Sequence, residues 1–317
     1  MTSGLIVNPR SGRSNNKGVD LARMLTGQPG VVIHILEDFR HIDSALEDCA
    51  AKGVTSLFIS SGDGTIQEIQ TQLAERKLFA NPPRLALLPH GTTNMTAADL
   101  GFRRKNLSQQ AAFILNPETG ETRTRPTLRV ANPRDGKPRH GMFLGTGAVW
   151  KATKFCQDAV HKTGLKGDFA TFATLAAAIG KSLFKKADPA DPDRIDRPYE
   201  MTIHGDHLVK ASGSHLLFFA TTLDRLILGT RPFWGGKKGP IRATILPYPV
   251  PNIPRWLLPI MYGGEDRAFP QGALSFSADS LEIKSATPYV IDGEFFDPPE
   301  SEALRVETGP VLTYLRG

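Results

Sequence analysis

The sequence predicts an α/β protein in two parts. An N-terminal three-layer α/β domain, residues 1–125, precedes an antiparallel β-sandwich domain, residues 126–317. In the first part, short apolar runs alternate with segments of helical periodicity, which is typical of a parallel sheet covered by helices. In the second part, prolines and glycines multiply and short alternating runs replace the helical pattern, which is typical of antiparallel sheets.

The elements of the first part follow from their periodicity. Apolar runs rich in β-branched residues predict strands, and apolar residues three or four positions apart predict helices. We expect strands at residues 5–7, 31–36, 54–59 and 85–88, and helices over residues 17–25, 42–51, 66–73 and 97–100.

Most of the second part is predicted to be β-structure, interrupted by one helix at residues 168–186. The Asp- and Pro-rich segment 187–197 predicts a surface loop. We expect strands at residues 127–130, 142–146, 201–203, 208–210, 216–220, 241–246, 281–283, 289–291, 304–306 and 311–315.

Three polar loops, residues 8–12, 60–65 and 89–94, each follow a predicted parallel strand. The carboxyl ends of such strands share one edge of the sheet, where ligands bind. Loops rich in Gly, Ser, Thr and Asn offer backbone and hydroxyl donors to a polyphosphate. The dinucleotide pattern G-x-G-x-x-G and the Walker pattern are absent, so neither of those nucleotide folds is supported.

The central loop contains Gly62-Asp63-Gly64 between a strand and a helix. Thr65 and Glu68 fit a capping box at the start of that helix. The loop taken alone fits either a tight turn into a well-capped helix or a phosphate cradle in which Asp63 holds a metal ion.

Composition indicates a soluble or peripheral protein. The 317 residues carry a formal net charge of +6, which suits an anionic ligand or surface. Among anionic partners we favour lipid, and we expect no nucleic-acid partner, because no RNA-binding or zinc-knuckle signature accompanies the basic residues. No leader or membrane-spanning run is present, and the two distant cysteines suit a reduced cytosol. We therefore expect a cytoplasmic protein on the inner membrane face.

The motifs together resemble the diacylglycerol kinase catalytic-domain family, which includes bacterial lipid kinases and the sphingosine and ceramide kinases. The segments 8–12, 61–68 and 88–94 resemble its first, second and third motifs. Gly145-Thr146-Gly147 is similar to the glycine turn that opens its second domain, and Asp292-Gly293-Glu294 to its late acidic motif. Alone, Asp-Gly is also a strong hairpin-turn dipeptide.

The resemblance implies ATP and Mg²⁺ as cofactors, with catalysis in a cleft between the two domains and a last strand that returns to the first. Glu294 would be the general base, and Asp63 would serve the metal and the phosphates as a second catalytic residue. Asp292 is a further expected metal ligand. The nucleotide-binding residues that the resemblance implies are Asn8, Pro9, Arg10, Ser11, Gly12, Ser61, Gly62, Asp63, Gly64, Thr65, Ile66, Gln67, Glu68, Gly91, Thr92 and Asn94.

Some positions depart from the family pattern. Met95 and Pro126 stand where many bacterial members carry an aspartate, and the segment 238–241 replaces an Asp-Gly tied to a structural cation. Ser61 in place of glycine resembles the sphingosine-kinase-like members. These differences leave the acceptor lipid open.

The segment 247–262 combines several prolines with Trp256, Leu258 and Arg255. It fits either a loop that touches the membrane or a proline-broken loop that packs on the sandwich.

These observations favour an ATP- and Mg²⁺-dependent lipid kinase that phosphorylates a diacylglycerol-like or sphingoid or ceramide-like lipid. The alternatives are a catalytically weak lipid- or nucleotide-binding protein on the same scaffold, and a kinase of soluble substrates that shares the Gly62-Asp63-Gly64 loop. A homodimer is left open.

Overall fold

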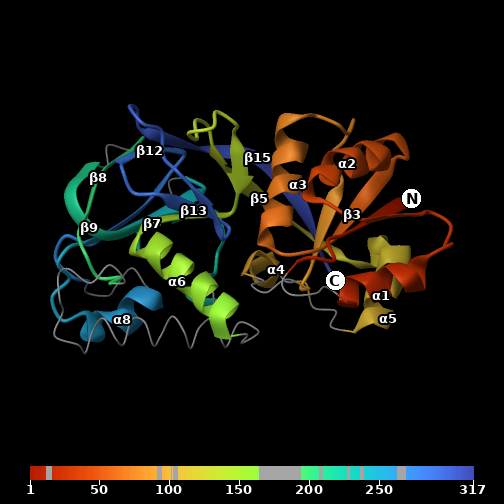
Figure 1. Ribbon diagram of the computed structural model, residues 1–317, viewed down its shortest axis with the longest axis horizontal. Coiled ribbons are helices and arrows are strands. Elements are labelled where there is room, and N and C mark those ends of the chain that lie inside the picture. The colour runs from red at the N-terminus through yellow and green to blue at the C-terminus, as the bar shows by residue number, and fades with distance from the viewer. Residues whose placement is uncertain are drawn as a thin grey trace. The chain divides into compact units, whose positions relative to one another are not determined.

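The computed structural model describes residues 1–11, 16–90, 95–100, 102, 106–163, 194–206, 210–226, 229–235, 239–262 and 269–317 (Figure 1). The chain divides into two compact units. Met1–Thr127 and Gly309–Gly317 form the first unit, and Leu128–Thr308 form the second. The predicted fold class, an α/β part followed by a β part, is confirmed.

A parallel sheet in the order β15-β4-β3-β1-β2 forms the centre of the first unit. Strands β1, β3 and β4 are mostly buried because both faces of the sheet are covered, which explains their continuous apolar runs, whereas the edge strand β2 is only partly buried. The strands are β1 (Thr2–Val7), β2 (Val31–Ile35), β3 (Val54–Ser60), β4 (Arg84–Leu88) and the end of β15 (Leu304–Arg316).

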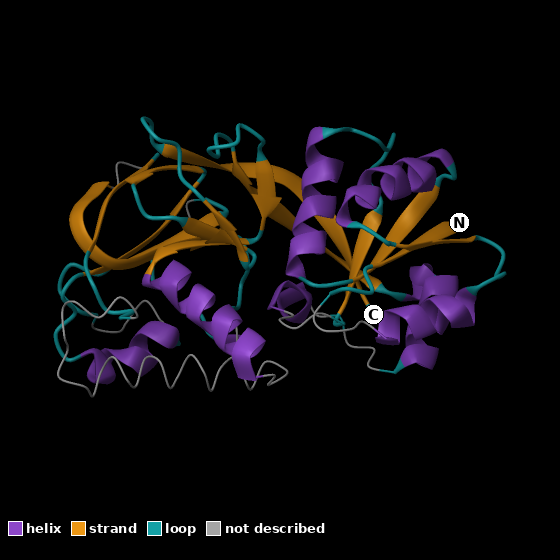
Figure 2. Ribbon diagram, viewed as in Figure 1, coloured by secondary structure: helices purple, strands orange, loops and turns teal. Residues whose placement is uncertain are grey.

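Helices cover both faces of this sheet (Figure 2). Helices α1 (Asn16–Leu25) and α5 (Leu107–Leu115) pack together over one face, against a core that includes Leu5 and Phe58. Helices α2 (Ile42–Ala51) and α3 (Asp63–Glu75) contact each other over the opposite face. The shorter elements are η1 (Phe39–His41), α4 (Met95–Leu100) and η2 (Pro117–Thr119).

Antiparallel strands dominate the second unit, in the order β14-β13-β7-β9-β8-β12-β15. The sheet branches at β9, whose first half pairs with β8 and whose second half lies between β7 and β10. The strands are the end of β5 (Glu121–Val130), β6 (Arg139–Gly141), β7 (Phe143–Gly147), β8 (Tyr199–Gly205), β9 (Lys210–Thr221), β10 (Ile241–Pro247), β11 (Leu274–Ala278), β12 (Ser280–Ser285), β13 (Tyr289–Ile291), β14 (Glu294–Phe296) and the start of β15.

Several local predictions were wrong. Residues 304–306 and 311–315 belong to one long strand, β15, and α5 was not predicted. Two further unpredicted helices, α6 (Ala148–Thr163) and α8 (Ile253–Met261), lie in the second unit. The segment 253–261 is a helix and not the predicted loop, with Pro254 in the first turn, where its missing N–H costs nothing, and Pro259 inside the helix. The predicted helix at residues 168–186 lies outside the described residues, as does most of the loop 187–197.

The helices of the described ranges are all too short or too polar to cross a bilayer. Both cysteines, Cys49 and Cys156, are buried and free.

Candidate active site

Strands β1 and β3 deliver two of the predicted loops to the same edge of the sheet. The Asn8 backbone N–H donates to the Ser60 carbonyl at 3.0 Å, and Asn8 Nδ2 donates to Thr65 Oγ1 at 2.9 Å. A Cβ built on Gly62 would lie 3.7 Å from the Ser11 Cβ. The first and second loops are therefore in contact and hydrogen-bonded to each other.

Helix α3 begins at Asp63 and is capped by Gly62 without any side-chain hydrogen bond. The predicted capping box is wrong because the helix starts three residues earlier than expected. Thr65 therefore lies inside the first turn, where its hydroxyl accepts the Asn8 side chain. The N–H groups of this first turn have no side-chain cap, which leaves an anion-binding helix end.

Three buried polar atoms at this edge have no hydrogen-bond partner among the described residues: Ser11 Oγ, Ser61 Oγ and Gln67 Nε2. All three residues are less than a tenth exposed. A buried polar group without a partner is costly, and it is retained where a ligand or water supplies the partner. Two hydroxyls and an amide donor therefore fit the oxygen-rich phosphate chain of a nucleotide.

The remaining predicted residues of these loops are placed as follows. Asp63 is the first residue of α3, where the helix dipole stabilises a carboxylate. Arg10 is exposed, and its backbone N–H donates to Asn8 Oδ1. Ile66 is buried, and Pro9, Gly64 and Glu68 are half-buried. Gly12, Gly91, Thr92 and Asn94 lie outside the described residues.

The start of the third loop is tied to the second through His90, which follows β4. His90 Nδ1 lies 2.8 Å from Ser60 Oγ at the end of β3. Burial, together with the positive charge of Lys17, lowers the pKa of His90 to about 4, so its ring is neutral near pH 7. His90 was not predicted as a site residue, although its place in the third motif could have indicated it.

A two-residue hairpin joins β13 and β14 in the second unit. Asp292 and Gly293 have φ values of 46° and 91°, the positive values that a type I′ turn requires. Glu294 follows directly and pairs with Ile291 across the hairpin. The hairpin-turn interpretation of this motif is confirmed, and the catalytic role of Glu294 stays a prediction.

The Asp292 carboxylate is buried and holds the backbone that leads into β7. Its oxygens accept the Met142 N–H at 2.9 and 3.2 Å and the Phe143 N–H at 2.9 Å. Burial raises the pKa of Asp292 to about 7, against the lowering effect of these two donors. Since both oxygens are occupied, this geometry favours a structural role, and the metal role stays a prediction.

Two neighbours that the sequence did not reveal complete the hairpin. A Cβ on Gly141 would lie 2.7 Å from Asp292 Oδ2, so only glycine leaves room there. Gln157 of α6 donates through Nε2 to the Gly293 carbonyl at 2.8 Å. Although Glu294 is exposed by surface area, surrounding protein atoms partly desolvate its carboxyl and raise its pKa.

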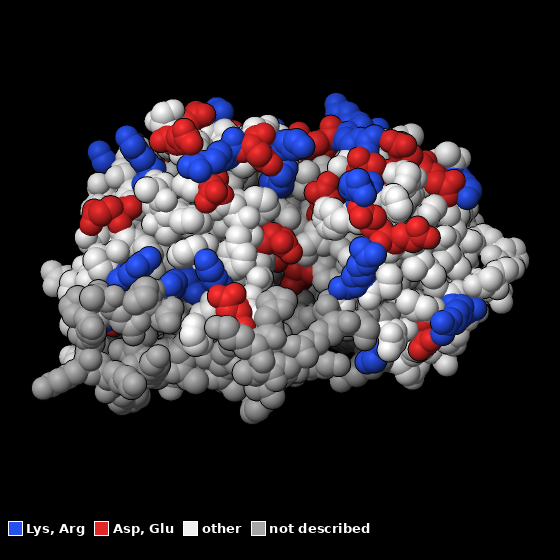
Figure 3. All heavy atoms as spheres, in the orientation of Figure 1, with Lys and Arg blue, Asp and Glu red and all other residues white. Residues whose placement is uncertain are grey.

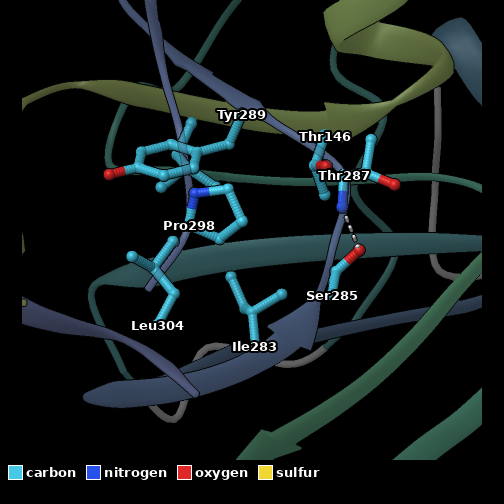
Figure 4. A pocket seen from close by; sticks show the side chains of 8 residues that line it. Thr146, Ile283, Ser285, Thr287, Tyr289, Pro298 and Leu304 are labelled. Atoms are coloured by element: carbon cyan, nitrogen blue, oxygen red, sulfur yellow. Dashed lines mark hydrogen bonds between the residues drawn. The ribbon is translucent and has the colours of Figure 1, made fainter. Parts of the chain in front are cut away.

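A small pocket opens in the second unit near the start of this hairpin (Figure 4). Its lining is mainly apolar, and Tyr289 is its one titratable group, with a pKa that burial raises. The pocket therefore has room for about one water molecule and offers no acid–base chemistry. Its lining residues are Leu144, Thr146, Ile283, Ser285, Thr287, Tyr289, Pro298 and Leu304.

Residues 2–124 match the model of the diacylglycerol kinase catalytic domain. This segment contains all three strand-end loops of the candidate nucleotide site. In sequence, residues 2–124 therefore resemble a diacylglycerol kinase catalytic domain.

The chain is similar to curated proteins with the same kind of domain. It is 33% identical over 218 residues to "Probable lipid kinase YegS" of Escherichia coli O9:H4 (strain HS), across 66% of this chain and 64% of that protein. It is 39% identical over 75 residues to "Probable lipid kinase YegS-like" of Enterobacter sp. (strain 638), across 23% of this chain and 25% of that protein. The matches thus span less than two thirds of either relative.

The fold is similar to a crystal structure of a diacylglycerol kinase from Bacillus anthracis str. Sterne. The superposition has a TM-score of 0.64 and covers 100% of this chain and 97% of that one, at 16% identity. The catalytic domain and the β unit that follows it therefore share their fold with that protein.

Among the groups of the catalytic domain, His90 should make stability depend on pH. The folded state takes up this proton only near pH 4, whereas the unfolded chain takes it up near pH 6.5, so stability should fall as pH drops between these values. The loss should reach about 3 kcal/mol. Urea unfolding between pH 4 and 6.5 measures the free energy of unfolding, which should depend less on pH in His90→Gln than in the wild type. The same pH dependence in both proteins would contradict the low pKa of His90.

Asp292→Ala should lower the free energy of unfolding by about 3 kcal/mol, because two buried N–H groups lose their acceptor. Asp292→Asn, which keeps the turn and one acceptor oxygen, should lose about half of that. Chemical denaturation measures both. Equal stability of Asp292→Ala and the wild type would show that these hydrogen bonds do not hold the hairpin.

Proposed function

We propose that the protein is an ATP- and Mg²⁺-dependent lipid kinase. It transfers the γ-phosphoryl group of ATP to a hydroxyl of a membrane lipid, either diacylglycerol-like or sphingoid or ceramide-like. The proposal places it in the cytoplasm, in transient contact with the anionic inner face of the membrane.

One observation carries this proposal. The loops after β1 and β3 are hydrogen-bonded to each other and surround three buried polar atoms that have no partner in the described part of the chain. These atoms belong to Ser11, Ser61 and Gln67, all within a diacylglycerol kinase catalytic domain. A phosphate chain would supply the missing acceptors.

Within this proposal the nucleotide contacts both loops. Ser11 and Ser61 would donate hydroxyl hydrogen bonds to phosphate oxygens, and the uncapped start of α3 would face the same negative charge. Mg²⁺ is usually held by one or two carboxylates together with phosphates and water, so Asp63 suffices as the protein ligand. The described residues contain no cluster of three or more acidic, His or Cys ligands. When bound, the ion would neutralise charge on the phosphates.

Glu294 would act as the general base. The lipid hydroxyl oxygen forms a bond to the γ-phosphorus, the bond from that phosphorus to the ADP oxygen breaks, and Glu294 accepts the hydroxyl proton. Burial shifts the pKa of Glu294 upward, towards physiological pH. A general base is most effective when its pKa lies near the operating pH, so this shift favours proton transfer.

The names of the relatives favour a lipid acceptor over a soluble one, because both curated relatives are named as lipid kinases. Met95 at the start of α4 and Pro126 in β5 provide no carboxylate. Asp99 of α4 is 3.6 Å from Arg125, so its charge is engaged by a cation. The proposal therefore assigns the metal-binding role to Asp63, at the start of α3.

Glu294→Gln should lower the turnover number about 10²–10⁴-fold, because it removes the base while keeping the side-chain shape. Asp63→Asn should reduce turnover by a similar factor and also weaken the dependence on Mg²⁺. Transfer of labelled phosphate to detergent-dispersed lipid measures both, and a thermal shift with ATP verifies that Glu294→Gln still binds nucleotide.

Glu302→Gln and Asp20→Asn are matched controls, since both side chains are exposed and lie outside the predicted sites. They should retain full turnover. Wild-type turnover in both Glu294→Gln and Asp63→Asn would overturn the assignment of base and metal ligand, and turnover on soluble acceptors without lipid would overturn the lipid specificity.

A further inference from the structure

Among the described α-helices, α8 is unusual because none of its residues is fully buried. Ile253, Trp256 and Ile260 pack against the core of the second unit, which holds the helix in place. On its outward side, Leu258 is 64% exposed, and Tyr262, just past the helix end, is 46% exposed. A leucine and a tyrosine four residues apart share one helix face, so they form a single apolar stripe.

Arginines lie at both ends of this stripe. The Arg255 guanidinium lies over the Trp256 ring, 5.2 Å from its centre, and Arg255 is exposed. Arg231 is also exposed, and its backbone N–H donates to the Met261 carbonyl at 2.7 Å, next to the end of α8. In the part of the chain that the structure describes, neither arginine has an ion-pair partner.

The sequence of α8 contains no Asp or Glu, so no carboxylate of the helix offsets these two charges. On the face shown in Figure 3, the acidic and basic side chains of the described residues are interspersed. We define the α8 surface as Arg231, Arg255, Leu258 and Tyr262. It combines exposed apolar groups with two cations that have no ion-pair partner among the described residues, and this combination distinguishes it from an ordinary solvated surface.

An anionic phospholipid surface would accommodate both the exposed apolar side chains of the α8 surface and its two arginines. Interfacial helices place apolar side chains at the boundary between headgroups and acyl chains, and Tyr favours that depth. Arginine binds lipid phosphates and is attracted by anionic leaflets. At nine residues, α8 is too short to span a bilayer, so it would lie in the plane of the interface.

We propose that the α8 surface docks the protein on anionic membranes, with Leu258 and Tyr262 inserted at the headgroup boundary and both arginines on lipid phosphates. The biological sense of this docking rests on the proposed lipid kinase function, because it brings the enzyme to a substrate held in the bilayer. Vesicle binding itself is measured without turnover.

The test is co-sedimentation of the full chain with vesicles of phosphatidylethanolamine, with or without phosphatidylglycerol. The wild type should bind the vesicles that contain phosphatidylglycerol, and less so as salt is raised. Leu258→Asp should weaken binding about ten-fold. The double variant Arg231→Glu/Arg255→Glu should weaken it by a similar factor and remove most of the salt dependence.

Leu115→Asp is the matched control, because Leu115 ends α5 in the first unit and is 49% exposed. It should bind vesicles as the wild type does, and circular dichroism verifies that each variant is folded. If Leu258→Asp fails to fold, the double variant Arg231→Glu/Arg255→Glu still tests the α8 surface, because both arginines are exposed.

Wild-type vesicle binding by both α8 variants would overturn the proposal, as would absence of binding by the wild type. A change in sedimentation of the free protein caused by Leu258→Asp would instead assign this face to self-association and would also overturn it. Vesicle binding without any phosphate transfer would support the docking surface while refuting the kinase function. Phosphate transfer to detergent-dispersed lipid by a variant that no longer binds vesicles would support both the docking surface and the kinase function.

Discussion

The hydrogen bonds of Asn8 are the interaction on which the candidate nucleotide site depends. The backbone N–H holds the end of β3, and the side chain reaches Thr65 in the first turn of α3. Asn8 thus fixes the first loop against both β3 and α3, the two elements that flank the second loop. Because the loops are fixed, the buried polar atoms of Ser11 and Ser61 keep positions at which a ligand can complete their hydrogen bonding.

A second constraint acts in the β unit, where a glycine and an aspartate together shape the acidic hairpin. Gly141 leaves the space that the Asp292 carboxylate fills, and that carboxylate accepts the N–H groups at the start of β7. The turn then presents Glu294 at the first position of β14. A dipeptide that is common in ordinary hairpins would also orient a reactive carboxylate if Glu294 is the general base, so the two interpretations of this motif do not exclude each other.

The strands of the first unit could be predicted because their residues are apolar on both faces, as a covered parallel sheet demands. The contact between its loops could be expected from the shared sheet edge, but the role of Thr65 could not, because it depends on where α3 begins. Helix α8 was missed because prolines usually end helices, whereas here one of them lies in the first turn. His90 and Gln157 were missed because their partners are distant in sequence.

The central claim, that this chain moves phosphate from ATP to a lipid, is tested most directly by incubating the purified protein with γ-labelled ATP, Mg²⁺ and a total-lipid extract, and then separating the lipids by chromatography. The account predicts a new labelled lipid that is absent without protein, and its mobility identifies the acceptor class. Absence of any labelled lipid, from protein that a thermal shift shows to bind ATP, would contradict the claim and support a lipid- or nucleotide-binding protein on the same scaffold.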